Sequence, residues 1–234
     1  MAARENESRV GATGGEGTYG RWPRWLQAVR LVVVAIALMA GTRVAAAKTL
    51  HLVAFGDSLS AGYMLPQNDA FPTVLEKALR DAGRDVTVAN AAVSGDTTSD
   101  GLARLDWSIP DDTDGVLLEL GANDMLRGLD PELVRKNLSA MLDRLKERHI
   151  PVLLIGMRAT PSLGRDYVTR FDAIYPDLAR TYGVQLYPFF LDGIAEDPAL
   201  NLQDGMHPNP EGVRKVVAAI LPSVEKFLDG FGKQ

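Results

Sequence analysis

Five short and mostly apolar runs recur along the chain, with amphipathic segments between them. They occupy residues 50–55, 86–93, 115–120, 151–155 and 184–187. A strand that is covered on both faces is apolar along its length, whereas a strand with one solvated face alternates apolar and polar residues. The runs therefore predict five buried strands in a parallel sheet.

The segments between the runs have the apolar spacing of helices that cover such a sheet. Helices are expected over residues 71–82, 131–149, 168–182 and 210–228. Gly83 is a typical helix stop, and Asp130 before Pro131 is a typical N-cap before a first helical position. Strands that alternate with helices predict a three-layer α/β/α sandwich with a central five-stranded parallel sheet. Functional groups are then expected beyond the carboxyl ends of the strands.

The first 47 residues have the three-part pattern of a secretory signal peptide. Arginines at positions 21, 24 and 30 precede an apolar run over 31–41, and three alanines at 45–47 provide a small-residue cleavage site. We expect cleavage after Ala47, followed by export to the periplasm or secretion from the cell. An uncleaved membrane anchor is the alternative, although the run is shorter than the roughly 20 apolar residues that span a bilayer. Residues 48–234 are expected to fold as a single domain.

The net charge and the cysteine content exclude several classes of partner and several kinds of chemistry. Six of the 25 basic and three of the 30 acidic residues lie in residues 1–47, which leaves a net charge of −8 on residues 48–234. This acidity disfavours nucleic acid and anionic membranes as partners, and no stable membrane insertion is expected after cleavage. The absence of cysteine excludes disulfides, thiol nucleophiles and thiolate metal sites. No cofactor or metal is expected, and the oligomeric state is left open, with a monomer favoured.

Ser58 follows the first apolar run and is either a turn or cap residue or a nucleophile that needs a base. The chain has three histidines. His51 lies inside an apolar run and His149 ends an expected helix, so packing or solvation accounts for both. His207 lies in a Gly- and Pro-rich loop before the last helix, where Asp204 can accept a hydrogen bond from its ring. G-x-S-x-G and H-E-x-x-H do not occur, which disfavours an α/β-hydrolase elbow and a zinc site.

Four separated segments resemble, in order, the four blocks of the SGNH (GDSL) hydrolase superfamily. They are GDSLS at 56–60, SGD at 94–96, GAND at 121–124 and DGMHP at 204–208. Flanking stretches such as SGDTTSDGLARL and LELGANDMLRG are similar to the bacterial branch of arylesterases, acyl-CoA thioesterase I and lysophospholipase L1. The resemblance implies the flavodoxin-like fold of this superfamily and an esterase activity.

The resemblance also implies a role for each matching residue. Ser58 would be the nucleophile, His207 the general base and Asp204 the group that orients the histidine. The oxyanion hole would consist of the backbone N–H groups of Ser58 and Gly95 and the side-chain amide of Asn123. These residue types fit the chemistry, because glycine allows close backbone approach and an amide donates without changing its protonation state.

The substrate is expected to be a small-molecule or lipid ester whose acyl group lies between the loops after the third and fourth strands. Apolar side chains on these loops suit an acyl chain better than a sugar. They are Met125, Leu126, Leu129 and Leu163. We expect hydrolysis of aryl esters and medium-chain acyl esters or thioesters, including acyl-CoA, with lysophospholipid as a further substrate.

Two other functions remain open from the sequence. One is a carbohydrate O-acetylesterase of the same superfamily, which would prefer acetate to longer acyl groups. The other is a flavodoxin-like module that binds phosphate at the helix beginning at Ser58, a function for which His207 and Asn123 would have no use.

Overall fold

The structure is a computed structural model that describes residues 48–231 together with residue 23. The chain falls into two units, Met1–Ala46 and Ala47–Gln234, and the second is described here. Apart from residue 23, the expected signal peptide and its cleavage site lie outside the described residues. Among the described residues, no helix is both long and apolar enough to cross a membrane.

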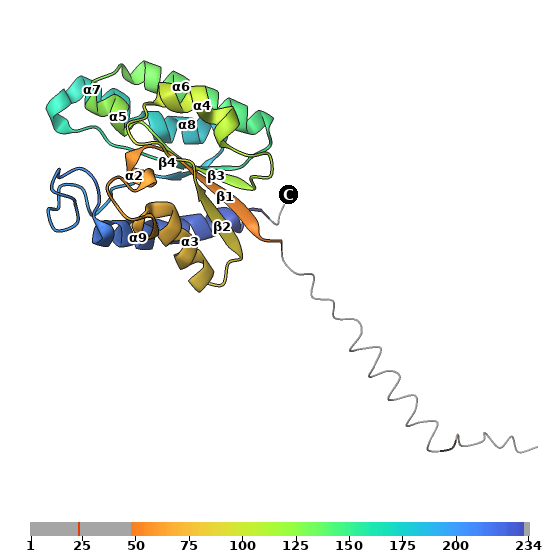
Figure 1. Cartoon of the computed structure of the whole chain (residues 1–234). Coiled ribbons are helices and arrows are strands. Elements are labelled where there is room, and N and C mark those ends of the chain that lie inside the picture. The colour runs from red at the N-terminus through yellow and green to blue at the C-terminus, as the bar shows by residue number, and fades with distance from the viewer. Residues whose placement is uncertain (1–22, 24–47, 232–234) are drawn as a thin grey trace, which may run out of the picture. The chain divides into compact units, whose positions relative to one another are not determined.

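A sheet of five parallel strands forms the centre of the described unit (Figure 1). The strands are β1 (Leu50–Phe55), β2 (Val86–Asn90), β3 (Gly115–Glu119), β4 (Val152–Ile155) and β5 (Gln185–Tyr187). They lie in the order β2-β1-β3-β4-β5, which confirms the parallel sheet expected from the apolar runs. The order reverses between β1 and β3, and open sheets of this kind bind ligands at that switch point.

Helices cover both faces of the sheet, as Figure 1 shows, so the three-layer sandwich is confirmed. One face carries α3 (Phe71–Asp81) and α9 (Pro210–Leu228), and the other carries α4 (Thr98–Ser108), α6 (Pro131–Glu147) and α8 (Ile174–Tyr182). Shorter helices are α2 (Ser58–Ala61), α5 (Ala122–Leu126), α7 (Arg165–Asp172) and the 3₁₀ turn η2 (Pro161–Leu163). The loops before α2, α4 and α5 leave the carboxyl ends of β1, β2 and β3.

The prediction of a single helix over residues 168–182 is wrong, because the segment forms parts of two helices. α7 ends at Asp172 and α8 begins at Ile174, with Ala173 between them. Pro176 explains the break, since proline has no backbone N–H and its ring clashes with the carbonyl four residues earlier. That carbonyl belongs to Asp172, where α7 ends.

The helix α4 was not expected, although its start carries a recognisable capping box. The Thr97 hydroxyl accepts the backbone N–H of Asp100, and the Asp100 carboxylate accepts the backbone N–H of Thr97 at 2.9 Å. Gly101 lies inside this helix. A glycine is required there because an added Cβ would lie 2.4 Å from the Leu120 side chain. This close packing gives α4 a glycine on its buried face, which weakens the apolar pattern by which a helix is recognised.

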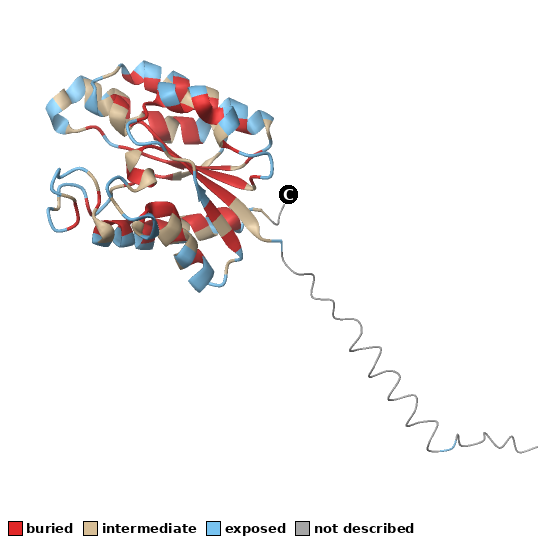
Figure 2. Cartoon of the chain, viewed as in Figure 1, coloured by how far each residue is buried: buried red, intermediate tan, exposed pale blue. Residues whose placement is uncertain are grey.

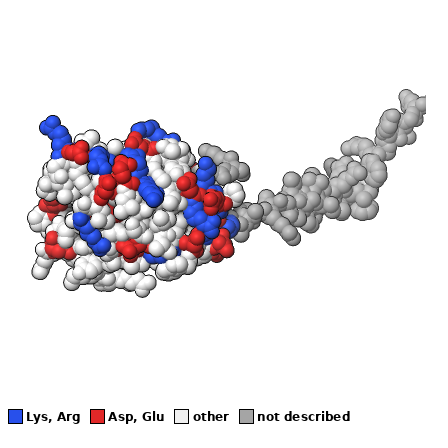
Figure 3. All heavy atoms as spheres, turned by 90° about the horizontal axis from the view of Figure 1, so that it is seen from above, with Lys and Arg blue, Asp and Glu red and all other residues white. Residues whose placement is uncertain are grey.

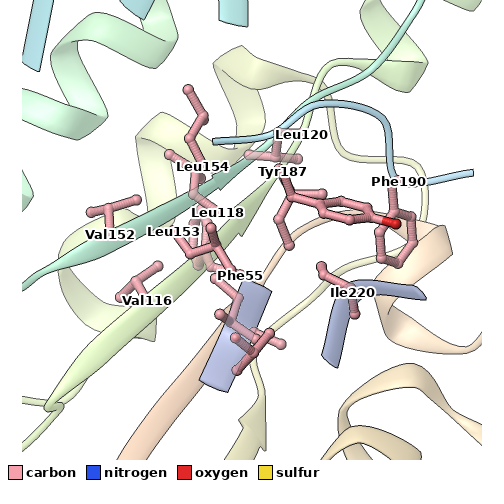
Figure 4. Packing of buried hydrophobic residues seen from close by; sticks show 14 of the residues in the cluster. Phe55, Val116, Leu118, Leu120, Val152, Leu153, Leu154, Tyr187, Phe190 and Ile220 are labelled. Carbon is pink, nitrogen blue, oxygen red and sulfur yellow. The ribbon is translucent and has the colours of Figure 1, made fainter. Parts of the chain in front are cut away.

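The core lies between the sheet and the two helical layers. Figure 2 shows that buried residues concentrate in the strands and on the inner faces of the helices. Figure 4 shows part of this buried cluster, which includes Phe55 and Leu118 of adjacent strands as well as Phe190 and Ile220. The central strands β1, β3 and β4 are buried at their carboxyl ends, so the loops that leave them start from fixed positions, whereas the edge strands β2 and β5 are partly exposed.

Candidate active site

Ser58 is the first residue of α2 and directly follows the short connection that leaves β1 (Figure 1). Asp57 is the N-cap of α2, and its Oδ1 accepts the backbone N–H of Leu59 at 3.0 Å. Gly56 must lack a side chain, because an added Cβ would lie 2.5 Å from the Glu119 carboxylate on β3. Ser58 is thus the first helical residue beyond the end of a buried strand, on a loop that packs directly against the neighbouring strand.

Ser58, His207 and Asp204 form a continuous chain of hydrogen bonds, although Ser58 and His207 are 149 positions apart in sequence. Ser58 Oγ lies 2.9 Å from His207 Nε2, and His207 Nδ1 lies 2.7 Å from Asp204 Oδ2. An ionised carboxylate only accepts hydrogen bonds, so the imidazole proton resides on Nδ1 and the Nε2 lone pair faces the serine hydroxyl. In this arrangement histidine can take the proton of Ser58 as the serine attacks a substrate.

Backbone groups of the same loop hold Asp204 in its ionised form. The N–H groups of His207 and Met206 donate to Asp204 Oδ1 at 3.0 and 2.9 Å. These bonds, helped by the His207 ring, lower the pKa of Asp204 to about 2. The loop itself is closed by a bond of 2.7 Å from the Leu202 N–H to the His207 carbonyl.

The three groups expected to form an oxyanion hole lie at the ends of three adjacent strands, after β1 for Ser58, β2 for Gly95 and β3 for Asn123. In the described part of the chain, neither the Ser58 nor the Gly95 backbone N–H donates a hydrogen bond to another group. The Asn123 amide donates to Asp57 Oδ2 at 3.1 Å and to the Asp96 carbonyl at 3.0 Å. An oxyanion bound by Asn123 would therefore replace one of these two bonds.

A buried arginine, which sequence reasoning missed, ties the loops after β1 and β2 together. Arg104 donates to Asp96 Oδ2 at 2.5 Å and to the Gly56 carbonyl at 3.0 Å. A further bond of 2.6 Å reaches the Ala91 carbonyl. Because Asp96 follows Gly95 and Gly56 precedes the nucleophile loop, this one cation sets the spacing between the two loops. In the sequence, Arg104 is marked only as a charged residue on the inner face of α4, a helix that was not predicted.

Asp124, next to Asn123, is a second buried charge that the sequence did not single out. Its two carboxylate oxygens accept the backbone N–H and the hydroxyl of Thr98 at 2.8 and 2.7 Å. The side chain is fully buried. It therefore attaches the first turn of α4 to α5, and with it the loop that carries Gly95.

Two buried carboxyl groups have no role in the hydrogen-bond chain, Asp57 in the nucleophile loop and Glu119 on β3 against it. Glu119 Oε2 accepts the Ser60 hydroxyl at 2.8 Å and the Asp57 N–H at 3.3 Å, whereas Oε1 has no partner among the described residues. Burial raises the pKa of Glu119 well above its usual range, and the nearby Asp57 adds to this. Burial also raises the pKa of Asp57 to about 6, although the bonds from Leu59 and Asn123 oppose it.

The four residues expected to line the acyl pocket lie in two loop regions that contact each other, the end of α5 with the residues after it and the turn η2. They are Met125, Leu126, Leu129 and Leu163. The Tyr167 hydroxyl on α7 donates to the Leu129 carbonyl at 2.9 Å, which joins the loops. Leu126 is 56% exposed, whereas the other three are partly buried. Arg127 donates to the Gly95 carbonyl at 2.8 Å, so the end of α5 lies beside the Gly95 loop.

The other two histidines lie away from Ser58. His51 Nδ1 on β1 is 2.9 Å from the Thr87 hydroxyl on β2. His149 follows α6 and lines a cavity of about 470 Å³ between the ends of α6, α8 and α9, near the amino ends of β4 and β5. This cavity is at the opposite end of the strands from Ser58. No group of three or more His, Cys, Asp or Glu side chains in the described ranges is placed to hold a metal ion.

A parallel α/β sandwich that carries a Ser-His-Asp chain at its switch point defines a serine hydrolase. Residues 54–215 match the GDSL-like Lipase/Acylhydrolase family. The chain belongs to this family, and it is therefore an ester-hydrolysing enzyme.

Several proteins of known name are similar to the chain along most of their length. An arylesterase of Vibrio mimicus is 43% identical over 178 residues, which cover 76% of this chain and 89% of that protein. Thioesterase 1/protease 1/lysophospholipase L1 of Escherichia coli K12 is 40% identical over 168 residues, which cover 71% and 78% respectively. The crystal structure of AlinE4, an SGNH-hydrolase family esterase, has a TM-score of 0.65 at 47% identity and covers 76% of this chain and 96% of its own.

Proposed function

We propose that Ser58 attacks the carbonyl carbon of an ester or thioester while His207 takes its proton and Asp204 holds the ring in position. The observation that carries this proposal is the unbroken chain of short contacts, 2.9 Å from Ser58 to His207 and 2.7 Å from His207 to Asp204. A serine hydroxyl is a weak nucleophile on its own, and an adjacent oriented base activates it.

The reaction proceeds in two steps that return every group to its starting state. As the bond from Ser58 Oγ to the carbonyl carbon forms, the proton passes to His207 Nε2 and then to the departing alcohol or thiol. Water next attacks the acyl-enzyme, gives a proton to His207, and the acid leaves as Ser58 regains its proton. In both steps the negative oxygen is bound by the N–H groups of Ser58 and Gly95 and by the Asn123 amide.

The proposed substrates are aryl esters and medium-chain acyl esters or thioesters, with lysophospholipid as a further substrate. The similar proteins are named as an arylesterase and as a thioesterase and lysophospholipase. The partly buried side chains of Met125, Leu129 and Leu163 add an apolar lining that suits an acyl chain. Kinetics across p-nitrophenyl esters of increasing chain length test this, because a strict preference for acetate would favour a carbohydrate O-acetylesterase instead.

Labelling with a fluorophosphonate tests the assignment of the nucleophile. The probe phosphonylates an activated serine, so mass spectrometry is expected to find a single modified peptide that contains Ser58. The Ser58→Ala variant should not react, whereas Ser223→Ala, a change in helix α9, should react like the natural chain. Modification at another serine, or none in a folded protein, would refute the assignment of Ser58 as the nucleophile.

We also propose that residues 1–47 are a signal peptide and that the enzyme acts after export. The proposal is supported by the basic, apolar and Ala-Ala-Ala segments in that order. Expression in a bacterial host followed by cell fractionation and N-terminal sequencing tests it. The expected product is a periplasmic or secreted protein that begins at Lys48, and an intact chain retained in the membrane would support an anchor instead.

A further inference from the structure

Two side chains at opposite ends of the short helix α5 hold the loop that carries Gly95. Asn123 donates to the Asp96 carbonyl at 3.0 Å, and Arg127 donates to the Gly95 carbonyl at 2.8 Å. α5 spans Ala122–Leu126, so the first bond comes from the start of the helix and the second from the residue that follows its end. Residues four positions apart lie on the same side of a helix, which allows both side chains to reach one loop.

Gly95 has a backbone conformation that its own surroundings do not enforce. Its φ of +91° lies in the region that glycine adopts readily and other residues avoid. A Cβ added at this position would meet nothing within 4 Å, so no packed neighbour confines the residue on that side. The direction of the Gly95 N–H therefore depends on the hydrogen bonds of the peptide groups next to it.

The peptide group between Ser94 and Gly95, which carries this N–H, makes no hydrogen bond to any described residue. It is held through the peptide groups on either side, each of which is planar. On the carboxyl side, the Asp96 N–H donates to the Val93 carbonyl at 3.2 Å, and Arg127 donates to the Gly95 carbonyl at 2.8 Å. The arginine bond is the shorter of the two, and a charged donor makes the stronger bond. Arg127 is thus the firmer anchor of this peptide group.

We propose that Arg127 is a positioning residue for the oxyanion hole, because its guanidinium holds the Gly95 carbonyl and thereby keeps the Gly95 N–H in the direction that binds the negative oxygen. This rests on the proposed function, in which that N–H is one of three oxyanion donors. Donors that are fixed in advance stabilise developing charge without having to reorient during the reaction. Arg127 acts through the backbone in this role and does not contact the substrate.

An exposed arginine near an active site could instead bind an anionic group of a substrate. Figure 3 shows basic and acidic side chains interspersed on one face of the molecule, so basic side chains do not form a single patch there. The Arg127 side chain is exposed, yet its guanidinium donates to a backbone carbonyl. The two roles have different kinetic effects, since binding an anionic group changes KM, whereas positioning an oxyanion donor changes kcat even for a neutral substrate.

Kinetics with the neutral substrate p-nitrophenyl butyrate test the positioning role. Arg127→Ala is expected to lower kcat about tenfold with little change in KM. This is less than the loss of about 10² to 10³ for removing a donor outright, because the Gly95 N–H remains present but is less well aligned. Arg127→Lys keeps a cationic donor and should recover most of the rate.

Arg165→Ala is the matched control for the loss of one positive charge. Arg165 begins α7 and is exposed as Arg127 is, but among the described residues it donates no hydrogen bond to the Gly95 loop. This variant should have the kcat and KM of the natural protein. All three arginine variants change an exposed side chain and should melt at the same temperature as the natural protein.

The backbone order parameter of Gly95, measured by ¹⁵N relaxation, reports the positioning without depending on catalysis. We expect about 0.85 in the natural protein, as for a rigid backbone, and less than about 0.6 in Arg127→Ala. An unchanged order parameter in Arg127→Ala would overturn the positioning role, and so would an unchanged kcat in an active enzyme or a raised KM alone. A Gly95 that becomes mobile in Arg127→Ala, in a protein that hydrolyses no ester, would overturn the proposed function and leave the anchoring of Gly95 by Arg127 intact.

Discussion

The hydrogen bonds at Ser58 have only one possible direction, because Asp204 is fixed as an acceptor. Two backbone N–H groups and the His207 ring donate to its carboxylate, and its pKa falls to about 2. The carboxylate thus stays ionised at any pH well above 2. It keeps the imidazole in the tautomer that accepts a proton from Ser58.

Removal of either reacting side chain should abolish catalysis while the fold survives. We expect Ser58→Ala or His207→Ala to lower kcat for p-nitrophenyl butyrate by about 10⁶, because the triad acts as a unit. Asp204→Asn should cost about 10⁴, since the imidazole then takes the wrong tautomer. Retention of more than a few percent of activity by purified Ser58→Ala would show that another group is the nucleophile.

Asn123 should affect the transition state more than the binding of substrate. Asn123→Ala is expected to lower kcat by about 10² to 10³ with little change in KM, as for the loss of one oxyanion donor. The variant also loses the bonds to Asp57 and Asp96, so its thermal unfolding is measured alongside. A raised KM with an unchanged kcat would instead assign Asn123 to ground-state binding.

Residue types and order were enough to propose the reacting groups, but not the groups that position them. Ser58, Asp204 and His207 could be proposed because the chain has only three histidines and because the segments that carry these residues resemble blocks of the SGNH superfamily. Glu119 and Arg104 could not, since their partners come from other strands and loops, and only the folded chain brings these together. A glutamate inside an apolar run was nevertheless a visible sign of an unusual buried carboxyl.

At the level of elements, the loops after β1 and β2 depend on one another through a buried ion pair. Arg104→Met is expected to lower the free energy of unfolding by about 3 to 5 kcal/mol, because Asp96 then remains buried and unpaired. The double variant Arg104→Met/Asp96→Leu should recover part of this loss. Urea denaturation of both single variants and the double variant measures the coupling, and additive effects would mean that the pair contributes nothing specific.

The capping box of α4 contributes less to the free energy of unfolding than the buried ion pair does, and it depends on the Thr97 hydroxyl. Thr97→Ala removes the acceptor for the Asp100 N–H, and we expect a loss of about 1 kcal/mol in unfolding free energy. Thr97→Ser keeps the hydroxyl and serves as the control in the same denaturation experiment. Equal stability of the alanine and serine variants would show that the box does not stabilise the helix.

Elements with a long and regular apolar pattern could be predicted, and those shaped by single residues could not. The helix expected over 210–228 coincides with α9. The break at Ala173 depends on Pro176, and the helix α4 has a glycine where the pattern requires an apolar side chain. In both cases one residue opposes the periodicity of its neighbours, and tertiary packing decides the outcome.

At the scale of the whole molecule, the sheet gathers the site from distant parts of the sequence. β1, β2 and β3 are adjacent, so the loops that carry Ser58, Gly95 and Asn123 leave one edge together. The loop with His207 reaches the same edge because α9 packs along α3 on one face of the sheet. The same buried platform also encloses Asp57 and Glu119, so the stability of the entire fold is linked to their protonation.

Both buried carboxyl groups hold their protons more tightly in the folded than in the unfolded chain, since burial raises their pKa values. Their contribution to stability is complete below the unfolded pKa and is lost as pH rises through the folded pKa. For Asp57 this window runs from 3.8 to about 6. For Glu119 it begins near 4.5 and extends upward.

Glu119→Gln should remove the loss of stability that accompanies ionisation of Glu119 as the pH rises. Glutamine resembles the protonated acid and keeps an oxygen that can accept the Ser60 hydroxyl. We expect the variant to match the natural protein near pH 4 and to become progressively more stable than it up to pH 8, by at most about 1.4 kcal/mol per pH unit. Urea denaturation across this range measures the difference. The control Glu147→Gln changes an exposed carboxylate and should give a curve parallel to that of the natural protein; a parallel curve for Glu119→Gln would mean that Glu119 is ionised in the fold.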